Sequence, residues 1–239
     1  MNKIEHILAQ TSNRQYPLPR QKWKYYQEWH DTVLFHWKVP KILLEKYIPE
    51  GLELDTFNSI AWVSLVVFEV KNMRMRNVPA LPYISHFHEI NVRTYVIKDG
   101  IPGIYLFSIE TDKLIEVLFT RLLIGLPYKK SIINRTKSTL LADNTALNSH
   151  LNIEFKKETS PVEKTDLNVW LSERHALYEN FNKKIGRFDI HHPEWELHNL
   201  TAKIIKIKYQ AGRYNLNIYP DKVHYSKKTE VVLWGRKPV

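Results

Sequence analysis

One short segment carries an acid, an amide and a base at alternate positions. If residues 87–96, F-H-E-I-N-V-R-T-Y-V, form a β-strand, Glu89, Asn91 and Arg93 lie on one face and a mainly apolar row lies on the other. Two interpretations of the polar face remain open. In a sheet with one solvated side, the polar face would be exposed and Arg93 would pair with Glu89. In a small closed barrel, the same face would point inward around a ligand. In the second case Glu89 is a catalytic acid or base, and Asn91 and Arg93 bind the ligand.

A second candidate site is the turn G-L-P-Y-K-K at residues 125–130. A lysine pair after a Gly-x-Pro turn is one way to build a Schiff-base enzyme. Here Tyr128 stands between the proline and the lysines. Adjacent residues of an extended segment point in opposite directions, so we expect Tyr128 to face the interior and Lys129 and Lys130 to be solvated. The Tyr128 hydroxyl then acts on a substrate carbonyl as a hydrogen-bond donor or general acid, or its ring only closes the barrel end.

The helix expected at residues 113–124 carries an arginine in an apolar setting. A polar stripe follows one side of this helix, whereas Arg121 falls in the apolar arc. A buried guanidinium needs a carboxylate, because an unpaired buried charge costs several kcal/mol, roughly. Two partners remain open: a protein acid, with Glu89 or Glu110 nearest in sequence, or the carboxylate of a bound ligand.

Other motifs that carry chemistry are weak or missing. Residues 191–198, H-H-P-E-W-E-L-H, lack the spacing of an H-E-x-x-H metal site, and Pro193 disrupts a helix. We expect a turn packed by Trp195 and no metal. No G-x-S-x-G, G-x-G-x-x-G or P-loop pattern occurs, so we expect no serine triad and no cofactor.

The composition excludes further classes of protein. Cysteine is absent from the 239 residues, which rules out disulfides, thiolate nucleophiles and cysteine-based metal sites. The formal net charge is +10, but lysine and arginine are spread along the chain without a nucleic-acid-binding motif. We therefore expect a basic surface that attracts small anions, and no nucleic-acid partner. With no signal peptide and no apolar run long enough to span a bilayer, a cytoplasmic protein without membrane association is expected.

The elements that must position these side chains are mostly strands. Rows of β-branched and aromatic residues predict strands at 32–39, 60–70, 87–96, 104–110, 152–158, 187–192, 201–209 and 230–234, and helices are predicted at 40–49, 113–124 and 167–174. This pattern favours an α+β fold whose mainly antiparallel sheet curls into a barrel with flanking helices. We expect residues 1–22 to be a flexible arm and residues 23–239 a single domain.

The order of these blocks resembles the YqjF-like bacterial proteins, a family of uncharacterised function. The resemblance extends over residues 24–235 and rests on W-H-D-T-V-L-F-H-W, P-E-G-L-E-L-D, A-W-V-S-L-V-V-F, E-I-N-V-R-T-Y-V, G-I-Y-L-F-S-I-E, G-L-P-Y, W-L-S-E-R-H-A-L-Y and I-H-H-P-E-W-E-L. That family is distantly similar to acetoacetate decarboxylase. The resemblance implies a cone-shaped β-barrel with a ligand site inside it, and assembly into a homo-oligomer.

In acetoacetate decarboxylase a strand glutamate precedes a hairpin, and a helix with Gly-Arg-Glu leads to Gly-x-Pro-Lys-Lys. The first lysine forms a Schiff base and the second depresses its pKa. By resemblance, Glu89 matches the strand glutamate and Arg121 the arginine, while Leu122 replaces the acid. Tyr128 falls at the Schiff-base lysine and Lys129 at its helper. The nucleophile is therefore missing, unless a turn one residue longer brings Lys129 to its place.

These observations predict a protein that binds a small organic acid or carbonyl compound inside a barrel, with acid/base chemistry but without the usual Schiff-base lysine. One alternative is a lysine-dependent decarboxylase or aldolase-like enzyme that uses Lys129. Another is a non-catalytic interaction protein with a basic surface. Because the matched lysine is absent, the sequence leaves open whether the protein is a lyase.

Overall fold

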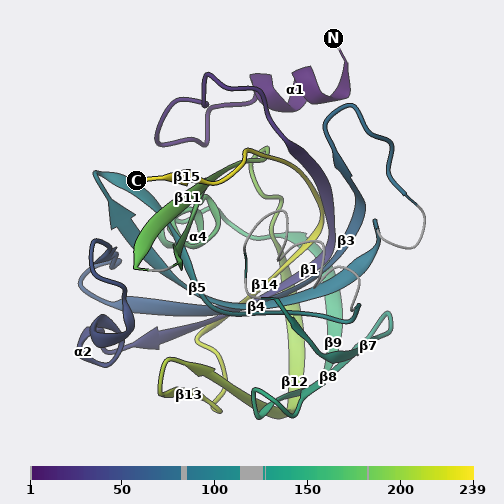
Figure 1. Cartoon of the computed structure of the whole chain (residues 1–239). Helices are drawn as coiled ribbons and strands as arrows, with labels where there is room; N and C mark the ends of the chain where they lie inside the picture. The colour runs from purple at the N-terminus through teal and green to yellow at the C-terminus, as the bar shows by residue number, and fades with distance from the viewer. Residues whose placement is uncertain (1, 82–84, 114–125, 127, 182) are drawn as a thin grey trace.

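The computed structural model describes residues 2–81, 85–113, 126, 128–181 and 183–239, and most of them belong to strands (Figure 1). The strands are β1 (Tyr25–Val39), β2 (Glu53–Leu54), β3 (Ala61–Met75), β4 (Phe87–Lys98), β5 (Ile101–Thr111), β6 (Lys129–Lys130), β7 (Ile132–Arg135), β8 (Thr139–Asn144), β9 (Ser149–Pro161), β10 (Ala176–Phe181), β11 (Lys184–His191), β12 (His198–Ala211), β13 (Tyr214–Leu216), β14 (Lys222–Leu233) and β15 (Lys237–Pro238). The helical elements are α1 (Lys3–Ala9), α2 (Lys41–Leu44), η1 (Glu45–Tyr47) and α4 (Asp166–Ser172). No described helix has the length and apolar character needed to cross a membrane.

Seven strands close into a ring. Hydrogen-bonded neighbours follow the order β11–β10–β5–β4–β3–β1–β14, and β14 pairs back onto β11 at Ile190↔Leu233 and His191↔Val232. Neighbours in the ring are antiparallel, except that β5 and β10 are parallel. Figure 1 shows these strands arranged around a common centre. Side chains on their inner face are therefore enclosed by the sheet itself.

The hairpin between β4 and β5 fixes which residues of β4 face inward. Its turn is the predicted Asp99-Gly100 pair, with φ of 50° and 73°. Two consecutive positive φ angles characterise the type I′ turn, which matches the twist of the flanking strands. The register then runs from Lys98↔Ile101 to Glu89↔Thr111. This register holds Glu89 near the end of β5, where the chain leaves the hairpin.

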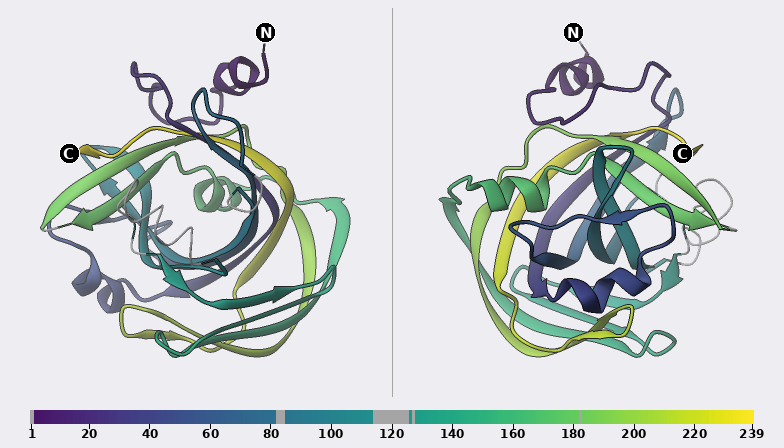
Figure 2. Two further views of the ribbon diagram at one scale, coloured as in Figure 1. Left: turned by 45° about the vertical axis from the view of Figure 1, so that its right-hand side comes forward. Right: turned by 90° about the vertical axis from the view of Figure 1, so that its left-hand side faces the viewer.

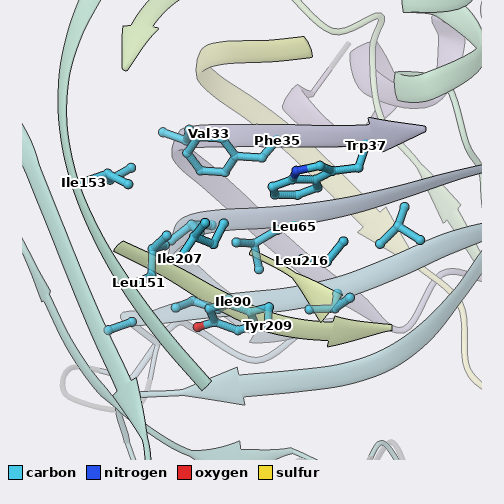
Figure 3. Close-up of a cluster of buried hydrophobic side chains, with 14 of the residues drawn as sticks. Val33, Phe35, Trp37, Leu65, Ile90, Leu151, Ile153, Ile207, Tyr209 and Leu216 are labelled. Atoms are coloured by element: carbon cyan, nitrogen blue, oxygen red, sulfur yellow. The ribbon is translucent and has the colours of Figure 1, made fainter. Parts of the chain in front are cut away.

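The outer face of β1, β3 and β4 is covered by a second group of strands. From β14 the sheet continues through β12, β9 and β8 to β7, and Figure 2 shows β9 and β12 curving beneath the ring. A hydrophobic core fills the space between them (Figure 3). It includes Phe35, Leu65, Ile90, Ile153 and Tyr209. The three strands are thus buried on both faces, which explains their long runs of β-branched and aromatic residues.

The predicted α+β fold with a mainly antiparallel, curled sheet is confirmed. The predicted strands at 60–70 and 87–96 lie within β3 and β4, and the helix predicted at 167–174 overlaps α4. The helix predicted at 113–124 lies, except for Lys113, outside the described residues. Within the arm of residues 1–22, α1 has an Asn2–Glu5 capping box and buries Ile7.

A chain of hydrogen bonds crosses the inner face of the ring. The Tyr95 hydroxyl donates to the Leu171 carbonyl (3.0 Å) and so accepts from Ser64 Oγ (2.7 Å). Ser64 Oγ in turn accepts from His36 Nδ1 (2.7 Å), which leaves a lone pair on His36 Nε2 to accept from His224 Nδ1 (3.2 Å). Every proton in this chain has one acceptor, and the lone pair on Nε2 makes the His36 imidazole neutral.

We expect these two histidines to contribute to a loss of stability in acid, together with the other buried histidines, His175, His191 and His192. Burial lowers the pKa of His224 to about 4, helped by the charge of Lys222. Burial also lowers the pKa of His36 well below 6.5, helped by the charges of His224, Arg93 and Lys222. Below pH 6.5 the unfolded chain therefore binds more protons than the folded one. The free energy of unfolding should fall as pH drops from about 6.5 to about 4, by roughly 3 kcal/mol for His224 alone.

Urea denaturation at several pH values across this window measures the effect. His224→Gln should flatten the slope of unfolding free energy against pH, because its side chain cannot be protonated. His6→Gln, at an exposed position of α1, is the matched control and should keep the wild-type slope. Equal slopes in the wild type and His224→Gln would contradict the prediction.

Candidate functional site

A small cavity of about 70 Å³ lies inside the ring. Its walls are mostly apolar and aromatic side chains of β1, β3, β5, β10 and β11, with a few polar groups from β1 and β4. A water molecule needs roughly 10–15 Å³ of such space, and sites for drug-sized ligands occupy roughly 300–1,000 Å³. The cavity therefore suits a compact ligand of a few heavy atoms. Its polar lining among the described residues consists of Gln27, Glu89, Asn91, Arg93 and the Tyr128 hydroxyl.

The polar row of β4 faces this cavity. Glu89, Asn91 and Arg93 line it, whereas Ile90 and Val92, at the alternate positions, belong to the core on the outer face. The predicted alternation of this strand is confirmed. The sequence left open whether this polar face is solvated or turned into a barrel. In the structure it faces inward, because all three polar side chains are buried.

Glu89 is held by two hydrogen bonds. The Tyr128 hydroxyl donates to its Oε2 at 2.7 Å, and Asn91 Nδ2 donates to its Oε1 at 3.0 Å. Both donors are buried, and the Glu89 side chain is enclosed by protein. Burial raises the pKa of Glu89 to about 7, although these two hydrogen bonds and the charge of Arg93 oppose the shift. The protonated form of the carboxyl group is therefore far more accessible at neutral pH than for a solvated glutamate.

Two polar atoms of the cavity wall are buried without a hydrogen-bond partner among the described residues: the Nε of Arg93 and the Oδ1 of Asn91. The first is a donor and the second an acceptor. Burial lowers the pKa of Arg93, and Tyr95 and Glu89 partly offset that effect. Guanidinium nevertheless stays charged in proteins. The site thus presents a cation, one unpaired donor and one unpaired acceptor toward a space large enough for a small molecule.

Tyr128 and Lys129 point in opposite directions, as the alternation predicted. Tyr128 is 4% exposed and reaches Glu89, whereas Lys129 is exposed in the short strand β6, which pairs with the end of β5. Burial, together with the neighbouring carboxyl of Glu89, raises the pKa of Tyr128 well above 10, so its hydroxyl keeps its proton. Tyr128 therefore lines the cavity, whereas Lys129 does not.

The remaining predicted residues fall elsewhere. Arg121 lies outside the described residues. Glu110, considered as its partner, is buried on the outer side of the ring, where Ser131 Oγ and Asn144 Nδ2 donate to its Oε2. Glu110 is therefore separate from the cavity lined by Glu89.

Sequence reasoning missed several residues of the cavity wall. Trp29, Phe68 and Trp195 form one aromatic side of it, with the ring centroids of Trp29 lying 5.0 Å from Phe68 and 5.9 Å from Trp195. Gln27 adds a polar group there and accepts a hydrogen bond from Trp29 Nε1 (2.7 Å). Alternation along β1 could have placed Gln27 and Trp29 on one face. Nothing in the sequence brings Trp195 beside them, because Trp195 follows β11, which is separated from β1 by β14 in the ring.

The fold is shared with solved structures of low sequence similarity. The acetoacetate decarboxylase of Legionella pneumophila aligns with a TM-score of 0.60 over 100% of this chain and 97% of that chain, at 14% identity. The enduracididine biosynthesis enzyme MppR, complexed with pyruvate, aligns with a TM-score of 0.57 over 94% of this chain and 93% of that chain, at 10% identity. The chain thus has an acetoacetate decarboxylase-like fold, as the resemblance implied.

Sequence similarity defines the family more narrowly. Residues 26–230 match the model of DUF2071, an uncharacterized conserved protein. The uncharacterized protein YqjF of Bacillus subtilis (strain 168) is 34% identical over 220 residues, which cover 89% of this chain and 91% of that protein. The chain belongs to the DUF2071 family, and the predicted resemblance to YqjF-like proteins is confirmed.

We expect Glu89→Gln to stabilise the protein at alkaline pH. The pKa of Glu89 is about 7 in the folded chain and 4.5 at its ordinary value, so the folded state holds its proton more tightly. This contribution is fully present below pH 4.5 and is lost as pH rises through 7, by roughly 3 kcal/mol. Relative to wild type, the variant should gain roughly 2.5 kcal/mol of unfolding free energy between pH 5 and pH 8.

Chemical denaturation of both proteins at the two pH values measures the difference. Glu53→Gln, at an exposed position of β2, is the control and should follow the wild type. The prediction fails if the difference between Glu89→Gln and wild type is the same at both pH values.

Proposed function

We propose that the protein binds a small carboxylate- or carbonyl-containing molecule in the cavity inside its strand ring. The observation that carries this proposal is the guanidinium of Arg93, which lines the cavity and whose Nε is buried without a partner among the described residues. A buried donor without an acceptor costs roughly 1–3 kcal/mol, and more when it is charged. A ligand oxygen beside Arg93 would recover this free energy.

The charge balance of the cavity favours an anion. Arg93 is a permanent cation, whereas burial raises the pKa of Glu89 to about 7 and so favours its neutral form. The described lining therefore carries a net positive charge whenever Glu89 is protonated, and its low polarity strengthens the attraction for a carboxylate. Asn91 Oδ1, which is also unpaired, adds an acceptor for a hydroxyl or amide group of the same ligand.

Glu89 is suited to move a proton on such a ligand. A general acid or base works best when its pKa lies near the working pH, and the value of about 7 meets that condition. The Tyr128 hydroxyl, 2.7 Å from Glu89 Oε2, stabilises the ionised carboxylate that remains after proton donation. We therefore propose acid/base chemistry next to a carbonyl, with Glu89 as the catalytic residue and Tyr128 as its hydrogen-bond donor.

Similarity to other proteins supports the ligand class. The related fold of MppR has been solved with pyruvate bound, a compact molecule that has both a carboxylate and a carbonyl group. Pyruvate has six heavy atoms and matches the small volume of the cavity. We propose a ligand of this kind for the present chain, recognised mainly through Arg93.

We expect pyruvate or another short 2-oxo acid to raise the melting temperature and to bind in isothermal titration calorimetry. Acetone, which lacks the carboxylate, should bind far more weakly, because Arg93 then has only a carbonyl to contact. Arg93→Lys keeps the charge but loses the planar guanidinium, so binding should weaken by about tenfold or more. Arg20→Lys, at an exposed position, is the matched control. The proposal is wrong if no short carboxylate or carbonyl compound binds, or if Arg93→Lys binds as well as wild type.

We also expect no Schiff base in the wild type. Tyr128 occupies the cavity position beside Glu89 and cannot form an imine, and Lys129 is exposed. Treatment with borohydride and pyruvate or acetoacetate should therefore leave the intact mass unchanged. Tyr128→Lys places an amine at that position and should acquire an adduct, which makes it the positive control. An adduct on Lys129 of the wild type would instead support the lysine-dependent alternative.

A further inference from the structure

A second cluster of titratable side chains lies outside the cavity, where α4 ends beside the end of β11. Glu173, His175 and His192 are all buried, and each offers one ligand atom within 4.8 Å of the others. Glu173 and His175 lie between α4 and β10, whereas His192 directly follows β11. The stretch 191–198 alone predicted no metal site, but it supplies only one of these three residues.

The cluster has more buried lone pairs than protons. His175 Nε2 lies 3.2 Å from the Asn13 carbonyl oxygen, which can only accept, so Nε2 carries the ring proton and Nδ1 a lone pair. This Nδ1 is buried without a partner among the described residues, and so is the Oδ1 of Asn13. Glu173 already accepts from Asn13 Nδ2 at 2.7 Å and from the Trp195 amide at 3.0 Å. A cation would satisfy these acceptors together.

We propose that Glu173, His175 and His192 bind a divalent transition-metal ion of the zinc type, with Asn13 Oδ1 or water as a further ligand. Two imidazoles and one carboxylate are a common donor set for Zn²⁺ and related first-row ions. Metal-binding histidines usually donate their other ring N–H to a carbonyl or carboxylate, which orients the ring. The hydrogen bond from His175 Nε2 to the Asn13 carbonyl has this form.

Binding requires a small closure of the cluster. Glu173 Oε2 and His192 Nδ1 are 3.9 Å apart, whereas neighbouring ligands of tetrahedral zinc lie about 3.3 Å apart, given bonds of about 2.0–2.1 Å. The rings of His175 and His192 are stacked with centroids 4.5 Å apart. His192 Nδ1 also lies 2.8 Å from the Pro193 carbonyl oxygen, and this hydrogen bond would be exchanged for the metal bond.

The site would fasten the N-terminal arm to the ring. Asn13 contacts all three parts of the cluster, through Glu173, through His175 and through the His192 carbonyl (3.2 Å). The cluster also adjoins the cavity, because the amide of Trp195 binds Glu173 and its ring lines the cavity wall. The metal would therefore stabilise the position of Trp195 in the cavity wall without contacting the ligand. This inference does not depend on the proposed function of the cavity.

The test uses the full chain without a histidine tag, freed of metal by a chelator. Zn²⁺ and Co²⁺ are titrated against a competing colorimetric chelator. We expect one ion per chain, a visible Co²⁺ absorption band typical of tetrahedral nitrogen and oxygen ligands, and a higher melting temperature with Zn²⁺. His175→Phe, which keeps a ring stacked on His192, and Glu173→Gln, which keeps the shape of the side chain, should each weaken binding by at least about tenfold.

His150→Phe is the matched control, because His150 forms a partly exposed pair with Asp143 on another part of the surface. It should bind zinc like the wild type. The proposal is overturned if the wild type binds less than a stoichiometric ion, or if both His175→Phe and Glu173→Gln retain wild-type affinity. If His175→Phe does not fold, Glu173→Gln decides the question, and wild-type binding by that folded variant would reject the site.

Discussion

The closure of β14 onto β11 is the constraint on which the rest of the structure depends. Two ladder pairs, Ile190↔Leu233 and His191↔Val232, make this contact, and the Trp234 amide extends it by donating to the Asp189 carbonyl (3.0 Å); together they convert an open sheet into a ring. In an open sheet the polar row of β4 would face water and its charges would be fully hydrated. Inside the ring the same side chains lose that hydration, so their protonation and pairing are decided by their neighbours.

Loss of hydration has a larger effect on the pKa of Glu89 than any of its hydrogen bonds or its interaction with Arg93. Glu89 has two hydrogen-bond donors and a nearby guanidinium, all of which favour its ionised form, and its pKa is nevertheless raised to about 7. Tyr128 contributes a neutral donor at the position where the resemblance to acetoacetate decarboxylase expects an amine. A lysine there would add a second charge close to Arg93. With tyrosine at this position, Arg93 is the permanent cation among the described residues of the lumen, which supports the proposal of an anionic ligand.

The sequence predicts the strands well and the site in part, for physical reasons. Alternation identified Glu89, Asn91 and Arg93 because period-two patterns depend only on local geometry. The side on which Tyr128 lies followed from the same rule. Trp195 was not predictable beside Trp29, since β14 lies between β11 and β1, and the partners of His192 reach it through the pairing of β10 with β11. The aromatic wall and the cluster at Glu173 are thus products of topology and not of any local motif.

The buried polar networks discussed above differ in which hydrogen-bonding atoms are left unpaired among the described residues. Some are fully paired, one leaves a donor and an acceptor, and one leaves only acceptors. The chain from His224 to the Leu171 carbonyl uses every proton once and therefore needs no further partner. Glu110 is likewise satisfied by neutral donors of neighbouring strands, including Ser131 and Asn144. By contrast, the row of β4 leaves a donor and an acceptor unpaired beside a cavity, and the cluster at Glu173 leaves only acceptors. An unpaired donor on a cation is satisfied by an anion and an excess of lone pairs by a cation, so the same rule supports the two proposals of opposite ligands on either side of Trp195.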